Sequence, residues 1–153
     1  MTVSEISSYW PGFLAPSFTA RVVFSGSTFT VDLQSFRGKM VLLIFYPVDF
    51  GYICPTELMM VEKKLQEFKQ EECEVLAIST GSIVSKLAFL SVGREDGGVS
   101  GIGFGLVEDR DGEIGSMYEV MKEESRYSYR AMFLLEKESV VISSLVSYLL
   151  IGC

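Results

Sequence analysis

A strand–helix–strand pattern in the first half of the chain constrains the fold more than any other feature. The run Met40–Tyr46 is apolar throughout, which is typical of a strand covered on both faces. A helix is expected from Cys54–Pro55 to about Glu71, because proline is favoured in a first turn and apolar residues then recur every three or four positions. A second strand is expected over Cys73–Ser79. Two strands joined through one helix are parallel with a right-handed crossover, so the pattern predicts an α/β fold.

The remaining elements are expected to complete one domain around this unit. No repeat or linker interrupts the sequence, and 153 residues suffice for a single hydrophobic core, so one domain is expected over residues 1–153. Turn residues between β-rich segments predict a hairpin near each end of the domain. The further strands are expected at Phe18–Phe24, Thr28–Leu33, Phe104–Val107, Tyr129–Leu135 and Val140–Leu145, and the further helices at Ile83–Val92 and Ile114–Val120.

Composition removes several classes of function. The net charge of −7 argues against nucleic acid as a partner, because phosphate contacts need clustered lysine and arginine. The chain contains no histidine, which removes the usual general base, the commonest transition-metal ligand and any Ser–His or Cys–His nucleophile. The N-terminus lacks a signal-peptide pattern and the apolar runs are too short to span a bilayer, so a cytoplasmic protein without membrane contact is expected.

Three widely spaced cysteines leave a thiol as the candidate reactive group. Cys54, Cys73 and Cys153 form no CxxC pair, so neither a zinc site nor a thioredoxin-style dithiol is indicated, and no metal or cofactor is expected. Cys54 stands at an expected helix N-terminus, where unpaired N–H groups and the helix dipole favour an anion such as a thiolate. On position alone, however, the commoner case is a small buried residue in a helix cap. Cys73 is interpreted as a buried strand residue, about 25 Å from Cys54 along the intervening helix, too far for a disulfide.

A longer motif surrounds Cys54. The segment YPVDFGYICPTE at positions 46–57 resembles the loop of the typical 2-Cys peroxiredoxins, roughly FYPxDFTFVCPTE. The resemblance extends from Ala15–Phe18 to the hairpin around Phe133 and includes Gly97–Gly98 and Tyr129–Arg130. It implies a thioredoxin-like fold, with a central mixed β-sheet flanked by helices. It also implies a thiol-dependent peroxidase that reduces hydrogen peroxide and organic hydroperoxides through a cysteine sulfenic acid.

The resemblance assigns roles to individual residues. Cys54 matches the peroxidatic cysteine, which attacks the O–O bond of the peroxide. Arg130 matches the arginine that holds the thiolate and polarises the peroxide, a role that suits a permanently charged guanidinium. Pro47 matches a proline that shields the pocket, and Glu57 matches a carboxylate that orients the arginine. Both also suit purely structural roles, as a turn former and as a negative charge at a helix start.

The chain departs from the family pattern at two places. Gly51 stands where the family carries a threonine in the peroxide pocket. Glycine supplies no side-chain donor, and loss of one such donor can cost on the order of 100-fold in rate. The chain also stops at Cys153, without the helix and tail that bear the resolving cysteine in the family. Cys153 is therefore a possible resolving cysteine that reaches a neighbouring subunit; otherwise an external thiol must reduce Cys54.

Two hypotheses of different classes follow. In the first, the chain is an enzyme whose substrate is a peroxide and whose reductant is thioredoxin or another thiol. In the alternative, it is a catalytically weakened or silent relative that acts as a binding or chaperone-like module, which Gly51 and the apolar segment Val140–Ile151 would favour. The same apolar segment predicts a homodimer or larger homo-oligomer, because exposed apolar surface of this kind usually marks an interface.

Overall fold

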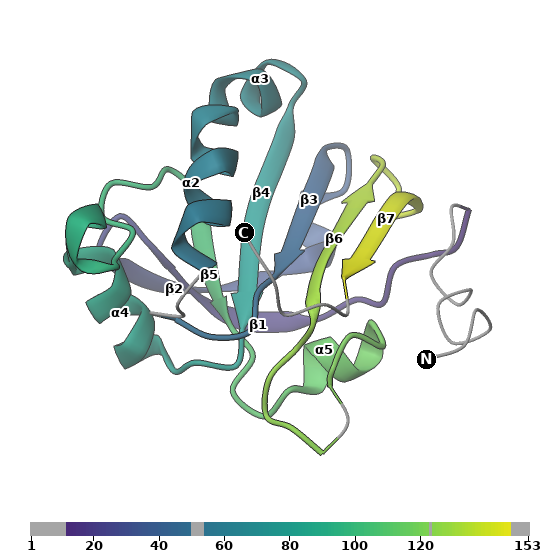
Figure 1. Ribbon diagram of the computed structural model, residues 1–153. Coiled ribbons are helices and arrows are strands. Elements are labelled where there is room, and N and C mark those ends of the chain that lie inside the picture. The colour runs from purple at the N-terminus through teal and green to yellow at the C-terminus, as the bar shows by residue number, and fades with distance from the viewer. Residues whose placement is uncertain (1–11, 50–53, 123, 148–153) are drawn as a thin grey trace.

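The structure is a computed structural model that describes residues 12–49, 54–122 and 124–147, and within them the chain forms one seven-stranded sheet with helices on both sides (Figure 1). The strand order is β2-β1-β5-β4-β3-β6-β7. The strands are β1 Thr19–Phe24, β2 Ser27–Asp32, β3 Met40–Phe45, β4 Cys73–Ser79, β5 Gly105–Glu108, β6 Arg130–Leu135 and β7 Val141–Ser147. The helices are α2 Cys54–Lys63, α3 Leu65–Gln70, α4 Ile83–Ser91 and α5 Glu113–Met117, with short 3₁₀ helices at Leu33–Phe36 and Arg94–Asp96.

The centre of the sheet is parallel and its flanks are antiparallel. β3 pairs with β4 and β4 with β5 in parallel, whereas β1, β2, β6 and β7 pair antiparallel with their neighbours. The helical connection between β3 and β4 confirms the predicted strand–helix–strand unit. The sheet is therefore mixed and flanked by helices, as predicted, and the carboxyl ends of β3, β4 and β5 lie along one edge of it.

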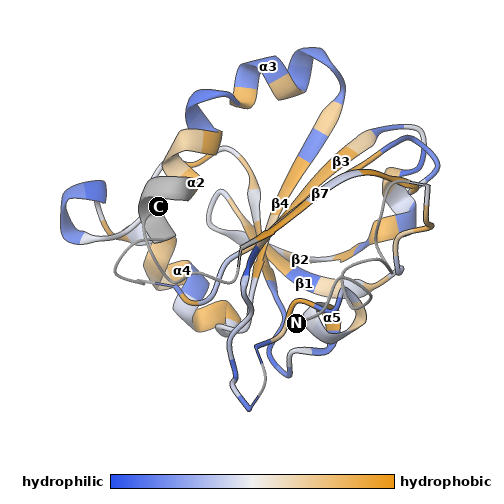
Figure 2. Ribbon diagram, turned by 45° about the vertical axis from the view of Figure 1, so that its right-hand side comes forward, coloured by the Kyte–Doolittle hydropathy of each residue, from blue (hydrophilic) through white to orange (hydrophobic). Residues whose placement is uncertain are grey.

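Two hydrophobic clusters, one on each face, hold the layers together. Along β3, Leu43 and Phe45 belong to the cluster that includes a buried side chain of α5. Leu42 and Ile44 belong to the other cluster, which includes buried side chains of α2 and α4. Side chains of a strand alternate between faces, so a strand covered on both must be apolar at every position. This explains the uninterrupted apolar run of β3. Figure 2 shows that the central strands are mainly hydrophobic, whereas α3 carries many hydrophilic residues.

The first hairpin turns where the sequence predicts it. Ser25 and Gly26 both have positive φ angles, 53° and 81°. Two consecutive residues of this kind form the tight turn whose twist matches that of a two-stranded ribbon. Glycine adopts this conformation without steric cost, which explains its place at the turn.

The helix predicted over 54–71 is instead two helices, and this part of the prediction is wrong. Lys64 separates α2 from α3, and its N–H donates to the carbonyl of Val61 at 3.0 Å, a tighter turn than an α-helix makes. Leu58 and Leu65 are both buried in the same cluster, so the tighter turn keeps the apolar side of both segments on the sheet. The last helix is also shorter than predicted. It ends at Met117, and Glu119 has a positive φ of 57°, which no helix accommodates.

Across the described ranges, no helix is both long and apolar enough to cross a membrane.

Candidate active site

Cys54 is the first residue of α2, as the sequence predicts. β3 ends at Phe45, and the connection to α2 leaves the sheet at the edge formed by the carboxyl ends of the parallel strands. Ligand sites of open α/β sheets form at this edge. Gly51 and its neighbours at 50–53 lie outside the described residues, and α2 is described only through its backbone over residues 54–57, which include Glu57.

Arg130 lies at the same edge, because its strand runs in the opposite direction to β3. It is the first residue of β6, which runs antiparallel to β3 with Ala131 opposite Phe45. The segment before β6 also contacts the connection to α2, because the Ser128 hydroxyl donates to the backbone carbonyl of Tyr46 at 3.3 Å. The topology thus brings the predicted arginine to the end of β3, where the chain leaves the sheet toward Cys54.

The Arg130 side chain is half-buried and lines a cavity of about 410 Å³. Met60 and Val61 of α2 line the same cavity, together with Met132 of β6 and Leu145 of β7. The lining of this cavity is mainly apolar, and it is open to solvent where Met60 and Leu145 are exposed.

A buried polar cluster lies beneath the connection between β3 and α2, and its centre is the Asp49 carboxylate. Oδ1 accepts hydrogen bonds from the hydroxyls of Tyr46 at 2.6 Å and Ser79 at 3.3 Å. Oδ2 accepts from the Ser85 hydroxyl at 2.9 Å and from Lys86 Nζ at 3.3 Å. Four donors from β4, α4 and the connection itself therefore fix one carboxylate.

Lys86 is the charged partner in this cluster and is fully buried. The exposed fractions of the Lys86 and Asp49 side chains are 0% and 1%. Burial lowers the pKa of Lys86 from its ordinary value, although the nearby Asp49 carboxylate favours the charged form. Lys86 lies on the α4 face that also buries Ile83 and Phe89. A lysine on the apolar face of a predicted helix is the signal that could have revealed this cluster from the sequence.

Known proteins resemble this chain over most of its length. A family model described as the AhpC/TSA family matches residues 11–144. The chain belongs to the AhpC/TSA family. Thioredoxin peroxidase from Echinococcus granulosus is 36% identical to it over 141 residues, which cover 92% of this chain and 73% of that protein. Peroxiredoxin-2 from Mus musculus is 33% identical over 141 residues, with coverage of 92% and 71%. The solved structure of the reduced 2-Cys peroxiredoxin from Plasmodium vivax matches with a TM-score of 0.88 at 36% identity, covering 94% of this chain and 75% of that chain.

These similarities confirm the predicted resemblance to the 2-Cys peroxiredoxins and the thioredoxin-like fold. Pro47 is also part of the family motif. It is half-buried and lies two residues beyond β3, in the connection to Cys54. The cluster around Asp49 adds a feature to which the sequence interpretation assigned no role, although Asp49 is part of the motif.

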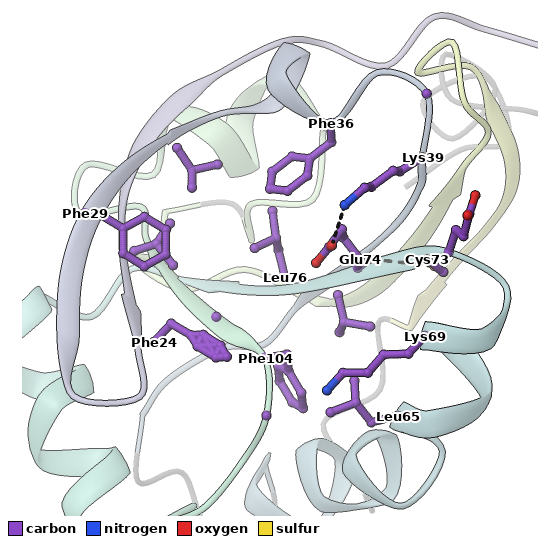
Figure 3. A pocket seen from close by; sticks show the side chains of 17 residues that line it. Phe24, Phe29, Phe36, Lys39, Leu65, Lys69, Cys73, Glu74, Leu76 and Phe104 are labelled. Carbon is purple, nitrogen blue, oxygen red and sulfur yellow. Dashed lines mark hydrogen bonds and ion pairs between the residues drawn. The ribbon is translucent and has the colours of Figure 1, made fainter.

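Cys73 lies at the opposite edge of the sheet from the start of α2. It begins β4, where it is paired with Met40 at the beginning of β3, and it is buried with a free thiol. The prediction of a buried strand residue is confirmed. It lines a cavity of about 600 Å³ around Phe24, Phe29 and Phe104, where Lys39 and Glu74 form an ion pair (Figure 3). This cavity therefore lies away from the family motif.

The Cys73 thiol is expected to be inert toward alkylation in the folded protein. Burial and then the neighbouring Glu74 carboxylate raise the pKa of Cys73 to about 11. At pH 8 only about 0.1% of such a thiol is ionised, compared with about a quarter of an ordinary cysteine. Iodoacetamide labelling followed by peptide mass spectrometry should show Cys73 modified at least about 100-fold more slowly in native protein than in urea. Equal labelling rates in the two conditions would contradict this assignment.

Proposed function

We propose that the chain is a thiol-dependent peroxidase in which Cys54 reduces hydrogen peroxide and organic hydroperoxides. One observation carries the proposal: Cys54 is the first residue of α2, at the sheet edge where β6 begins with Arg130. Relatives named thioredoxin peroxidase and peroxiredoxin-2 support this function over that of a silent binding or chaperone-like module.

The proposed reaction is a nucleophilic displacement at oxygen. The Cys54 thiolate attacks one peroxide oxygen, so that a sulfur–oxygen bond forms as the O–O bond breaks. The other oxygen takes up a proton and leaves as water or an alcohol. Cys54 is thereby oxidised to a sulfenic acid and the peroxide is reduced. The N-terminus of the ten-residue helix α2 favours an anion, and therefore the thiolate form of the proposed nucleophile.

Three further residues complete the proposed peroxide pocket. Pro47 shields the nucleophile from water, and Glu57, in the first turn of α2, orients the guanidinium of Arg130. Gly51 stands where the family motif has a threonine, so the hydroxyl donor of that threonine is absent. This chain therefore relies more heavily on Arg130 to stabilise charge in the transition state.

An external thiol closes the proposed cycle. Thioredoxin or another thiol reduces the sulfenic acid, and the Echinococcus relative, which is named thioredoxin peroxidase, supports thioredoxin. Cys153 of a second subunit is the alternative resolving group; it lies outside the described residues.

We further propose that residues 1–153 form a single domain, that the chain assembles into a homodimer or larger homo-oligomer, and that it is located in the cytoplasm. Size-exclusion chromatography with light scattering tests the oligomer, which a clean monomer at high concentration would exclude.

Oxidation by one equivalent of hydrogen peroxide tests the proposed chemistry most directly. The protein is treated in the presence of a sulfenic-acid trap such as dimedone and digested for mass spectrometry. We expect one adduct per chain, on Cys54, and none on Cys73. An adduct distributed among the cysteines in proportion to their exposure would reject Cys54 as a peroxidatic residue. So would the absence of both an adduct and a Cys54–Cys153 disulfide, since either product would record a sulfenic acid on Cys54.

Replacing Arg130 with methionine is expected to lower the second-order rate constant for hydrogen peroxide by about 100-fold to 1000-fold, because one preformed electrostatic donor is removed from the proposed site. Stopped-flow measurement of peroxide consumption provides the rate constant. Arg37→Met is the matched control, since Arg37 is exposed and follows the 3₁₀ helix at Leu33–Phe36. Equal rate constants for the two variants would contradict the role of Arg130.

A further inference from the structure

The buried Lys86–Asp49 pair includes Asp49, the last described residue of the connection before α2, and the proposed reaction does not use this pair. We propose that Lys86 is a positioning residue, which fixes Asp49 and thereby holds the connection between β3 and α2 so that Cys54 is placed for attack on the peroxide. The inference rests on the proposed peroxidase function, because that function gives the placement of Cys54 a measurable consequence.

Lys86 is held firmly enough to serve as an anchor. Its Nζ donates to Ser79 Oγ at 2.6 Å, to the Gly81 carbonyl at 2.9 Å, and to Asp49 Oδ2 and the Ser79 carbonyl at 3.3 Å. It also lies 5.8 Å from the centre of the Tyr46 ring, within the range of a cation–π contact. The ammonium therefore joins α4, the end of β4 and the connection after β3.

Asp49 transmits this anchoring toward Cys54. Through Oδ1 it accepts from the Tyr46 hydroxyl at 2.6 Å, so the two ends of the described part of the connection are tied together. Only four residues separate Asp49 from the first residue of α2. Because so few residues lie between the two, we expect a displacement of Asp49 to change the position of Cys54, and a misplacement of about 1 Å at a reacting group can cost on the order of 100-fold in rate.

Close packing around Asp49 leaves this carboxylate little freedom. A Cβ atom added at Gly81 would collide with Oδ2 of Asp49, which means that glycine is needed for this close approach. The other carboxylates near Lys86 already have backbone partners: Glu108 accepts from the N–H of Ile83, and Asp109 accepts from the N–H groups of Ile114 and Gly115. Asp49 is therefore the acidic group that can couple Lys86 to the motif.

Three variants test the inference: Lys86→Met, the isosteric Asp49→Asn, and the two changes combined. Each is checked for folding by circular dichroism, and Lys69→Met is the control because Lys69 is exposed at the end of α3. Two quantities are measured: the second-order rate constant for hydrogen peroxide, and the pH profile of Cys54 alkylation by iodoacetamide. The second quantity reports the environment of the thiol without any peroxide turnover.

We expect folded Asp49→Asn to lose about 10-fold to 100-fold in the rate constant, with an alkylation profile displaced toward that of an ordinary cysteine. Where Lys86→Met folds, it should show the same changes, and the combined variant should be no slower than the slower single variant, because both residues act through one contact. Asp49→Asn that folds and keeps the wild-type rate constant and profile would overturn the inference, whatever the behaviour of Lys86→Met. Additive losses in the combined variant would also overturn it. A wild-type protein that consumes no peroxide would instead reject the proposed function, and the alkylation profiles would still decide whether Lys86 and Asp49 place Cys54.

Discussion

Replacing Cys54 with serine is expected to abolish peroxide consumption, with a loss of at least about 1000-fold in the second-order rate constant. An enzyme that loses its nucleophile commonly falls by several orders of magnitude. Serine preserves the size of the side chain, but its hydroxyl does not ionise at neutral pH, so no anion is available to attack the peroxide. Stopped-flow assays with hydrogen peroxide and an organic hydroperoxide measure the effect.

The matched control for this experiment is Cys73→Ser. Cys73 is buried at the opposite edge of the sheet, and this variant should keep the wild-type rate constant. Peroxide consumption that survives in Cys54→Ser but disappears in Cys73→Ser would reverse the assignment. Equal and negligible rates for wild type and both variants would favour the silent binding module.

The largest effect on stability is expected at the buried ion pair. Replacing Lys86 with methionine leaves the Asp49 carboxylate buried without its cation, and breaking a buried pair in this way costs about 3–5 kcal/mol in the free energy of unfolding. Urea denaturation followed by circular dichroism measures the loss. The surface pair of Lys39 and Glu74, at 3.3 Å with about half of each side chain exposed, provides the control. Lys39→Met should cost no more than about 1 kcal/mol.

Replacing both members of the pair shows how much of the lost stability comes from leaving one buried charge without its partner. A variant with Asp49→Asn and Lys86→Met removes both charges and keeps an amide oxygen that can accept from the surrounding hydroxyls. It should therefore recover part of the stability lost in Lys86→Met, because no unpaired charge remains buried. A cost of less than about 1 kcal/mol for Lys86→Met alone would show that Asp49 is not held by Lys86 in solution.

The central architecture was predictable because local pattern and long-range pairing agree there. The apolar run that became β3 is covered on both faces, and only a central strand of a layered fold permits that pattern. The position of Cys54 at a helix start followed from Pro55 and from the apolar spacing after it. The break at Lys64 was not predictable, because the apolar spacing of a single helix and that of two short helices sharing one face are nearly the same.

The buried cluster shows what a motif alone does not disclose. Asp49 belongs to the segment that identified the family, and Lys86 lies 37 positions further along the chain. Their contact depends on how α4 packs against the end of β4, which no local periodicity records. The convergence of Arg130 on the same edge came from the family motif, because the sequence contains no other sign that β6 is placed beside β3.

β7 closes one side of the sheet, and this position has a consequence for how two copies of the chain can meet. Within the described residues, the outer side of β7 is bonded to backbone groups only at Val141, which contacts Gly12 and Phe13. Along the rest of this edge strand, the outward amides and carbonyls that have no backbone partner in the described part of the chain form a template for another β-strand. A second copy that paired antiparallel with β7 would join the two sheets into one continuous sheet. In each copy, β6, which begins with Arg130, would then be the second strand from the junction.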